Sequence, residues 1–274
     1  MIKRVVKVVL IGIISLSFTA CENNSQSLKK KEVKYTASLP IPSSSQEIRD
    51  TKLNMVSLWH DAKKDPIPAT QIGYAYSEEL KDYDKAIQWY KYSNSMKPMG
   101  ENSNYMCYAY QMKKEYEEAI KWCKNAIELG NDDALFQLGT SFSKINDFNN
   151  SIIWFKESFN KINNFSAANN IGYIYQEKLK KYNKAKEWYE MAIQGEDMES
   201  FHNISRLYHH NLNDDLKASA YSIALINNKF TKSSVLNTLQ NTWNIPNETI
   251  QKGYDLQLNS DEFPIKYKGN LGLK

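Results

Sequence analysis

The residues able to do chemistry are few, and they do not converge on one site. His202, His209 and His210 are grouped late in the chain, but His202 and His209 are two helical turns apart, or roughly 10 Å. Zinc ligands must all lie about 2 Å from one ion, so surface histidines are favoured over a metal site. Carboxylate pairs such as Asp132-Asp133 fall between expected helices, and the motifs of phosphate-binding loops, serine hydrolases and zinc proteases are absent. The sequence predicts no catalytic residue, no metal and no cofactor.

Two cysteines could form a covalent link. The repeat period described below places Cys107 and Cys123 on the two helices of one hairpin, both at inward positions. In an oxidising compartment they can form a disulfide if their Cα atoms approach to about 6 Å. Two small buried side chains are the alternative, since free cysteine packs well in a core. Both interpretations stay open, because the sequence supplies no distance.

The chain begins with the parts of an export signal. Three basic residues within the first seven positions precede an apolar run from Val8 to Phe18, which ends at Ala20. The run is short for a membrane span. These three residues account for most of the formal net charge of +4, and no clustered basic face suggests nucleic acid. We expect a signal peptide over 1–20, with ordinary secretion or an uncleaved anchor as alternatives.

The end of this segment, Phe18-Thr19-Ala20-Cys21, resembles the lipobox of bacterial lipoproteins, although that family usually has leucine where Phe18 stands. The resemblance implies that Cys21 is acylated and anchors the protein in the bacterial cell envelope, facing the periplasm. Glu22 follows in place of the aspartate that commonly retains lipoproteins in the inner membrane, which favours the outer membrane. Residues 21–45 are polar with spaced prolines and are expected to form a flexible tether.

The rest of the chain repeats one pattern. A small residue and an aromatic residue three positions later recur as Ala86/Trp89, Ala119/Trp122, Ser151/Trp154, Ala185/Trp188 and Ala218/Tyr221, at intervals of 33, 32, 34 and 33. A similar pattern precedes each copy as Gly73/Tyr76, Cys107/Tyr110, Gly139/Phe142, Gly172/Tyr175 and Ser205/Tyr208. Repetition at this period predicts stacked helical hairpins.

The small residues suggest how the two helices of a hairpin pack. We expect the small residue of the first helix to face the small residue of the second, so that the backbones approach closely and the aromatic rings fill the remaining space. Glycine within a helix costs about 1 kcal/mol relative to alanine, and close packing would offset that cost. The tryptophans in register are interpreted as core residues; a stacking platform for bases or sugars is the alternative.

These glycine, alanine and aromatic positions resemble the tetratricopeptide repeat family, and the Lys-Ala-x-x-Trp-Tyr form of the second helix resembles its Sel-like subclass. The resemblance implies an all-α fold, a right-handed α-solenoid of about five helix-turn-helix repeats with helical caps. We expect an N-terminal capping helix over 46–65, the repeat solenoid over 66–228, and a C-terminal helical cap and tail over 229–274. The register is lost after Phe230, and the end of the tail is expected to be irregular and frayed.

In this family, first-helix residues that flank the small position line a concave binding face. The implied face includes Thr70, Gln71, Tyr105, Thr140, Lys144 and His202, and its partner-binding residues are expected to be Tyr74, Asn104, Tyr108, Gln111, Asn170, Tyr173, Gln176, Arg206 and His209. Side chains of these types make good protein contacts. The clamp for a peptide carboxylate found in some members is not reproduced. A solvated groove with binding elsewhere is the alternative.

The resemblance therefore implies a non-enzymatic interaction module that binds a protein or peptide partner. A periplasmic scaffold or adaptor is the first expectation. An immunity protein that neutralises a periplasm-targeted secreted toxin, such as a type VI lipase effector, is the alternative. A repeat-containing hydrolase is a second alternative, which no group of residues supports.

Overall fold

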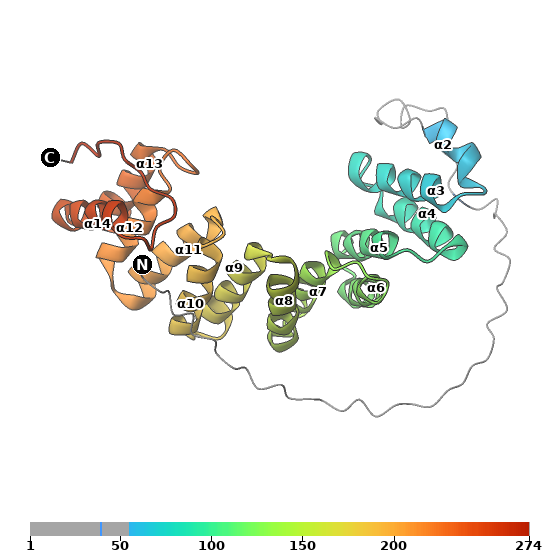
Figure 1. The fold of residues 1–274 in the computed structure, drawn as a ribbon, viewed down its shortest axis with the longest axis horizontal. Helices are drawn as coiled ribbons and strands as arrows, with labels where there is room; N and C mark the ends of the chain where they lie inside the picture. Colours follow the sequence, from blue (N-terminus) through green and yellow to red (C-terminus); the bar gives the residue numbers. More distant parts are fainter. Residues whose placement is uncertain (1–38, 40–54, 274) are drawn as a thin grey trace, which may run out of the picture. The chain divides into compact units, whose positions relative to one another are not determined.

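The computed structural model describes residue 39 and residues 55–273 of the chain (Figure 1). These residues belong to one compact unit, Tyr35–Lys274. The expected signal peptide over 1–20 and the expected lipidation site Cys21 lie outside the described residues, as does the tether apart from Leu39. The boundaries proposed for these segments stay predictions.

Residues 55–273 form a succession of helices without a β-strand. Helix α2 (Met55–Ala62) precedes five hairpins, which pair α3 (Pro66–Tyr74) with α4 (Tyr83–Met96), α5 (Gly100–Met112) with α6 (Tyr116–Glu128), α7 (Ala134–Lys144) with α8 (Phe148–Ile162), α9 (Phe165–Tyr173) with α10 (Tyr182–Ile193) and α11 (Met198–Leu207) with α12 (Asp215–Ala224). Helices α13 (Lys232–Asn237) and α14 (Asn247–Asn259) follow. From α2 to α13, each helix packs on the next along the chain (Figure 1), and α14 packs on α12. The predicted α-solenoid is confirmed.

Acidic and amide side chains fix where many of these helices begin. The backbone N–H group two or three residues further on donates a hydrogen bond to the side chain of Asp65, Asp82, Asp147, Asn164, Asp197 and Asp214. Each N-cap of this kind stabilises its helix by about 1 kcal/mol. The short connections between helices are therefore encoded locally.

Hairpins one, four and five contain one residue more between their helices than hairpins two and three. The extra residue is accommodated as a π-helical turn at the end of the first helix, over Ala75–Glu79, Ile174–Lys178 and Tyr208–Leu212. Such a turn absorbs an inserted residue without breaking the helix. The small residue of each first helix therefore faces the same position of the second helix in all five hairpins.

In hairpins one, three and four, a ring from the second helix lies on the glycine of the first. A Cβ atom added to the glycine would come within 2.6 Å of this ring, for Gly73 with Tyr90, Gly139 with Phe155 and Gly172 with Tyr189. Each of these three rings is at most 1% exposed. Burial of a whole ring against the helix offsets the conformational cost of a helical glycine.

The expected approach of the small residues is also visible. The Ser151 hydroxyl donates to the backbone oxygen of Gly139 at 2.8 Å, and the Ser205 hydroxyl donates to that of Ala218 at 2.9 Å. What the sequence pattern did not indicate is the ring on the glycine, which stands one position after the repeated tryptophan. Trp89 itself is fully buried, and the tryptophans of the next three hairpins are half-buried against neighbouring core residues.

Hairpins two and five fill the same two positions differently. A disulfide joins Cys107 to Cys123, whose Cα atoms are 5.1 Å apart. In hairpin five the hydroxyl oxygens of Ser205 and Ser222 are 2.5 Å apart. This pair of positions is thus occupied by a glycine and a ring, by a disulfide, or by two serines.

The chain after Phe230 keeps a hairpin geometry that its sequence hides. The Ile245 N–H group donates to the Leu239 oxygen at 2.9 Å, as the Asp82 N–H group donates to the Tyr76 oxygen in hairpin one. Helix α13 continues into a π-helical turn at Thr238–Thr242, and α13 and α14 both pack on α12. We call α13, this turn and α14 the terminal hairpin.

The tail beyond α14 is irregular, as expected, but it is not frayed up to the last described residues. Phe263 is 1% exposed, and its ring centroid lies 4.7 Å from that of Tyr221. Glu262 accepts hydrogen bonds from the Tyr221 hydroxyl and from Lys217, the latter at 3.0 Å. A buried ring and a paired carboxylate hold this segment on hairpin five, which corrects the expectation of fraying.

Candidate functional site

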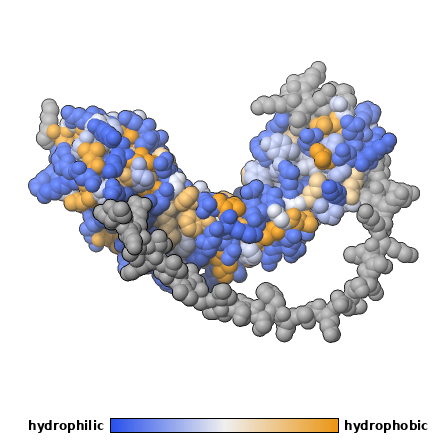
Figure 2. Space-filling view, in the orientation of Figure 1, coloured by the Kyte–Doolittle hydropathy of each residue, from blue (hydrophilic) through white to orange (hydrophobic). Residues whose placement is uncertain are grey.

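An accessible apolar site lies between the first helices of hairpins one and two. A hollow of about 360 Å³ is lined by Ile67, Thr70, Gln71, Tyr74, Met99, Glu101 and Tyr105. Ile67 is 58% exposed and Tyr74 40% exposed. On the face drawn in Figure 2, hydrophobic residues form separate patches among hydrophilic ones. We call this the first hollow.

The aromatic walls of the first hollow are held in place by contacts with one another. Tyr105 stacks on the buried ring of Tyr90, with centroids 5.6 Å apart, and meets Tyr74 edge to face at 5.6 Å. The Tyr105 hydroxyl donates to Glu101 at 2.9 Å. Burial, followed by this hydrogen bond, raises the pKa of Tyr105 to about 12. The Tyr105 ring is therefore uncharged and held in place, and with Tyr74 it offers apolar faces beside the Glu101 carboxylate.

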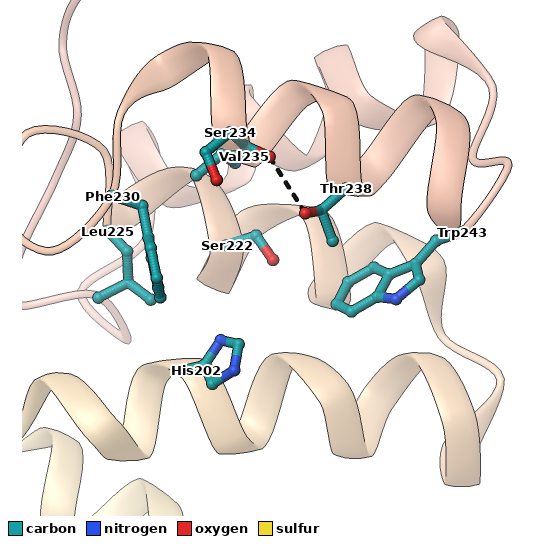
Figure 3. A pocket seen from close by; sticks show the side chains of 8 residues that line it. All are labelled: His202, Ser222, Leu225, Phe230, Ser234, Val235, Thr238 and Trp243. Carbon is teal, nitrogen blue, oxygen red and sulfur yellow. Dashed lines mark hydrogen bonds between the residues drawn. The ribbon is translucent and has the colours of Figure 1, made fainter.

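A second hollow, of about 190 Å³, lies between hairpins three and four. Its lining comes mainly from first helices and consists of Thr140, Ser143, Lys144, Phe155, Asn170, Tyr173 and Ile174. Tyr173 is 46% exposed. A third, smaller cavity lies between hairpin five and the terminal hairpin (Figure 3). The three spaces recur where the first helix of one hairpin meets the next hairpin.

The helical hairpins match a known repeat family and a solved structure. A family model described as Tetratricopeptide repeat matches residues 69–98 and 165–194. The solved structure of PilF from Pseudomonas aeruginosa is 14% identical, with a TM-score of 0.55, over 74% of this chain and 96% of that one. The chain contains tetratricopeptide repeats, which the family model matches in hairpins one and four.

Two other solved structures match the chain with lower TM-scores. A Sel1 repeat protein from Oxalobacter formigenes is 22% identical, with a TM-score of 0.49, over 72% of this chain and 89% of that one. YrrB, described as a TPR protein with an unusual peptide-binding site, is 16% identical, with a TM-score of 0.48, over 77% of this chain and 95% of that one. No curated protein matches in sequence. Repeats of the tetratricopeptide type form protein-interaction modules.

Several predicted binding residues line the hollows between tetratricopeptide hairpins. Tyr74 belongs to the first hollow, and Asn170 and Tyr173 to the second. Tyr108 is half-buried beside Tyr83, with ring centroids 6.5 Å apart, and burial raises its pKa. Arg206 is exposed on α11. For these five the assignment to a binding face stays a prediction.

Other predicted residues connect one tetratricopeptide hairpin to the next. Gln111 donates to the Gln137 backbone oxygen at 2.6 Å and to the Ser141 hydroxyl at 2.7 Å. Gln176, only 6% exposed, donates to Asn211 at 3.0 Å and accepts from the Tyr189 hydroxyl at 3.0 Å. Inter-repeat hydrogen bonds of this kind fix the register of adjacent hairpins, so these two amides act within the packing.

Asn104 and His209 are also partly withdrawn from the surface. The Oδ1 atom of Asn104 is buried without a hydrogen-bond partner among the described residues. His209 Nδ1 lies 2.6 Å from Asp215 Oδ1, and its ring stacks on Trp243 with centroids 4.5 Å apart. Spacing alone could place these residues on the first helix but could not show what else they contact.

Sequence reasoning missed Ile67, Met99 and Glu101 as lining residues of the first hollow. Ile67 stands between two prolines at the start of α3 and is exposed in the structure. An isoleucine at the first turn of a helix, flanked by prolines, was the sequence signal that could have identified it. Within residues 55–273 no group of three histidine, cysteine or acidic side chains could hold a metal ion. Across the same part of the chain, none of the helices has both the length and the apolar character that a bilayer crossing demands.

Proposed function

We propose that this chain is a non-enzymatic scaffold or adaptor that binds a protein partner through the first helices of its hairpins. The observation that supports this most strongly is the first hollow, where exposed Ile67 and Tyr74 stand beside fixed aromatic walls. Exposed apolar and aromatic residues that gather in a hollow are typical of interaction sites. Glu101 at its rim suits a partner segment that carries a basic residue next to an apolar one.

Capture of the partner tests this proposal. Full-length tagged protein from detergent-solubilised envelopes is expected to co-purify one protein in a saturable manner. The double variant Ile67→Ser/Tyr74→Ala should weaken capture at least tenfold, since truncation of a central interface anchor costs more than about 1 kcal/mol.

The control is Ile153→Ser, which removes an equally exposed hydrophobic residue (53%) from the second helix of hairpin three. This variant should capture the partner like the unaltered protein. Equal capture by all three proteins would contradict binding at the first hollow. Capture of a secreted lipase-type toxin in place of an envelope component would favour the immunity alternative.

We further propose that the protein is anchored through acylated Cys21 in the outer membrane and faces the periplasm. Support comes only from the lipobox resemblance at Phe18–Cys21 and from Glu22. The variant Cys21→Ser is expected to lose labelling by a palmitate analogue and to leave the membrane fraction. Unchanged labelling of this variant would refute the anchor without touching the interaction proposal.

A further inference from the structure

The cavity between hairpin five and the terminal hairpin is small, and side chains from several elements enclose it. Its volume is about 70 Å³, and it is lined by His202, Ser222, Leu225, Phe230, Ser234, Val235, Thr238 and Trp243. In Figure 3, His202 rises from α11 toward the space, with the rings of Phe230 and Trp243 on either side of it. The walls are mainly apolar and aromatic, with a few polar groups, as in ligand sites.

The repeat register explains why a space exists at this junction. Each hairpin is closed by a backbone hydrogen bond between its two helices, and this bond lets the hairpins be aligned residue by residue. In this alignment Ser222 of hairpin five corresponds to Tyr90 of hairpin one. Ser234 of the terminal hairpin corresponds to Tyr105 of hairpin two. Tyr90 and Tyr105 stack on each other, with an interplanar angle of 22°, and fill the junction between hairpins one and two. At the last junction both rings are replaced by serines.

The rings that remain around the cavity are held in place. Phe230 lies 5.4 Å from His202 between ring centroids, and Trp243 is stacked on His209 at 4.5 Å. His209 is itself bonded to Asp215. A site with fixed walls loses little freedom when it is filled.

The polar groups of the cavity are mostly committed to one another. Ser222 shares a hydrogen bond with Ser205, and Thr238 donates to the backbone oxygen of Ser234 at 3.1 Å. Among residues 55–273 the His202 imidazole makes a ring contact with Phe230 but no hydrogen bond. Burial lowers the pKa of His202, so its ring is uncharged near neutral pH. An uncharged imidazole nitrogen can accept a hydrogen bond from a phenol hydroxyl.

We propose that this cavity receives one aromatic side chain of a partner protein, a tyrosine whose hydroxyl faces His202. The ring takes the space that the Tyr90–Tyr105 pair fills at the first junction, and its hydroxyl donates a hydrogen bond to the His202 imidazole. A cavity of about 150 Å³ holds a whole benzene molecule, so a ring enters this one edge first and remains partly in its mouth. Aromatic walls favour a ring over an aliphatic chain of equal area.

This inference rests on the proposed function only in assigning the ring to a protein. The cavity adjoins α11, the first helix of hairpin five, as the first hollow adjoins α3. Both spaces therefore adjoin a first helix, although hairpins two to four lie between them along the chain. The chemistry of the cavity can be tested without the partner protein.

The test is a titration of the full-length protein in detergent with N-acetyl-L-tyrosine amide, followed by ligand-observed NMR. The tyrosine amide is expected to bind saturably and at least tenfold more tightly than N-acetyl-L-leucine amide. Ser222→Phe fills the cavity with the ring type of the other hairpins and should weaken binding at least tenfold. Ser233→Phe adds the same ring at an exposed neighbouring position and should leave the affinity within twofold.

Circular dichroism and the thermal midpoint show whether Ser222→Phe is folded. If this variant does not fold, Thr238→Phe takes its place, because it fills the cavity from the opposite wall. Equal affinity for the tyrosine and leucine amides, or full binding by both filled variants, would overturn the proposal. Tenfold tighter binding of phenol than of the tyrosine amide would identify a small-molecule site and overturn the assignment to a partner side chain. If the unaltered protein captures no partner but binds the tyrosine amide, the proposed function is rejected and the ring site is retained.

Discussion

Leucine in place of Gly172 is expected to lower the free energy of unfolding by about 3 kcal/mol or more. A Cβ atom at this position would lie 2.6 Å from the ring of Tyr189. The ring cannot move away, because it is fully buried and its hydroxyl donates to Gln176. A leucine side chain must therefore separate α9 from α10 or displace the ring. Urea unfolding followed by circular dichroism measures the change.

The matched control is Tyr173→Leu on the same helix. Tyr173 is 46% exposed, and surface substitutions of this kind usually change stability by less than about 0.5 kcal/mol. An unaltered unfolding midpoint for Gly172→Leu would show that the glycine and ring positions are not in contact, and the packing described for hairpins one, three and four would be wrong.

Removal of the disulfide in hairpin two is expected to cost about 3 kcal/mol, the value for a closed loop of roughly this length. Cys107 and Cys123 are 16 residues apart in sequence, and both are fully buried. The double variant Cys107→Ala/Cys123→Ala should show this loss under oxidising conditions. The unaltered protein should show it only after reduction, with unfolding in urea as the measurement in both cases.

A second double variant replaces the two cysteines by the glycine and ring found in other hairpins. Cys107→Gly/Cys123→Tyr installs the glycine and ring found at Gly73/Tyr90 and Gly172/Tyr189. It is expected to be more stable than the alanine pair and to be indifferent to reductant. If both cysteines of the oxidised, denatured protein react with an alkylating reagent, the disulfide is refuted.

The hairpins could be predicted from the sequence because their signal is periodic. Small residues and tryptophans at intervals of 32 to 34 positions define two helices per repeat, and the period survives substitution at single positions. The partner of each glycine was harder to infer. The ring on Gly73 comes from Tyr90, which follows the more conspicuous Trp89, and only the coordinates show which of the two faces the glycine.

The terminal hairpin could not be inferred in the same way. Gly253 stands where the other hairpins have a ring, a cysteine or a serine, so the pattern is lost while the backbone geometry persists. Tertiary contacts with α12 maintain the hairpin without the repeated residues. A pattern search depends on those residues and therefore stops at Phe230.

The binding face could be located by spacing but not resolved into individual contacts. Tyr74 and Tyr173 were predicted and are exposed beside hollows, whereas Gln176 was predicted and is buried in a hydrogen-bonded pair. Whether an amide on a first helix meets solvent or the next hairpin depends on long-range packing. The cavity beside Ser222 did have a sequence signal, because a serine stands where three other hairpins carry a ring.

The most direct measurement for the central proposal is photocrosslinking of the full-length protein in living cells. A photoreactive phenylalanine analogue placed at position 74, in the first hollow, is expected to give one discrete adduct with a second protein. The same analogue at position 153, on the second helix of hairpin three and more exposed (53%) than position 74 (40%), should give none. An adduct from position 153 with none from position 74 would contradict partner binding through the first helices.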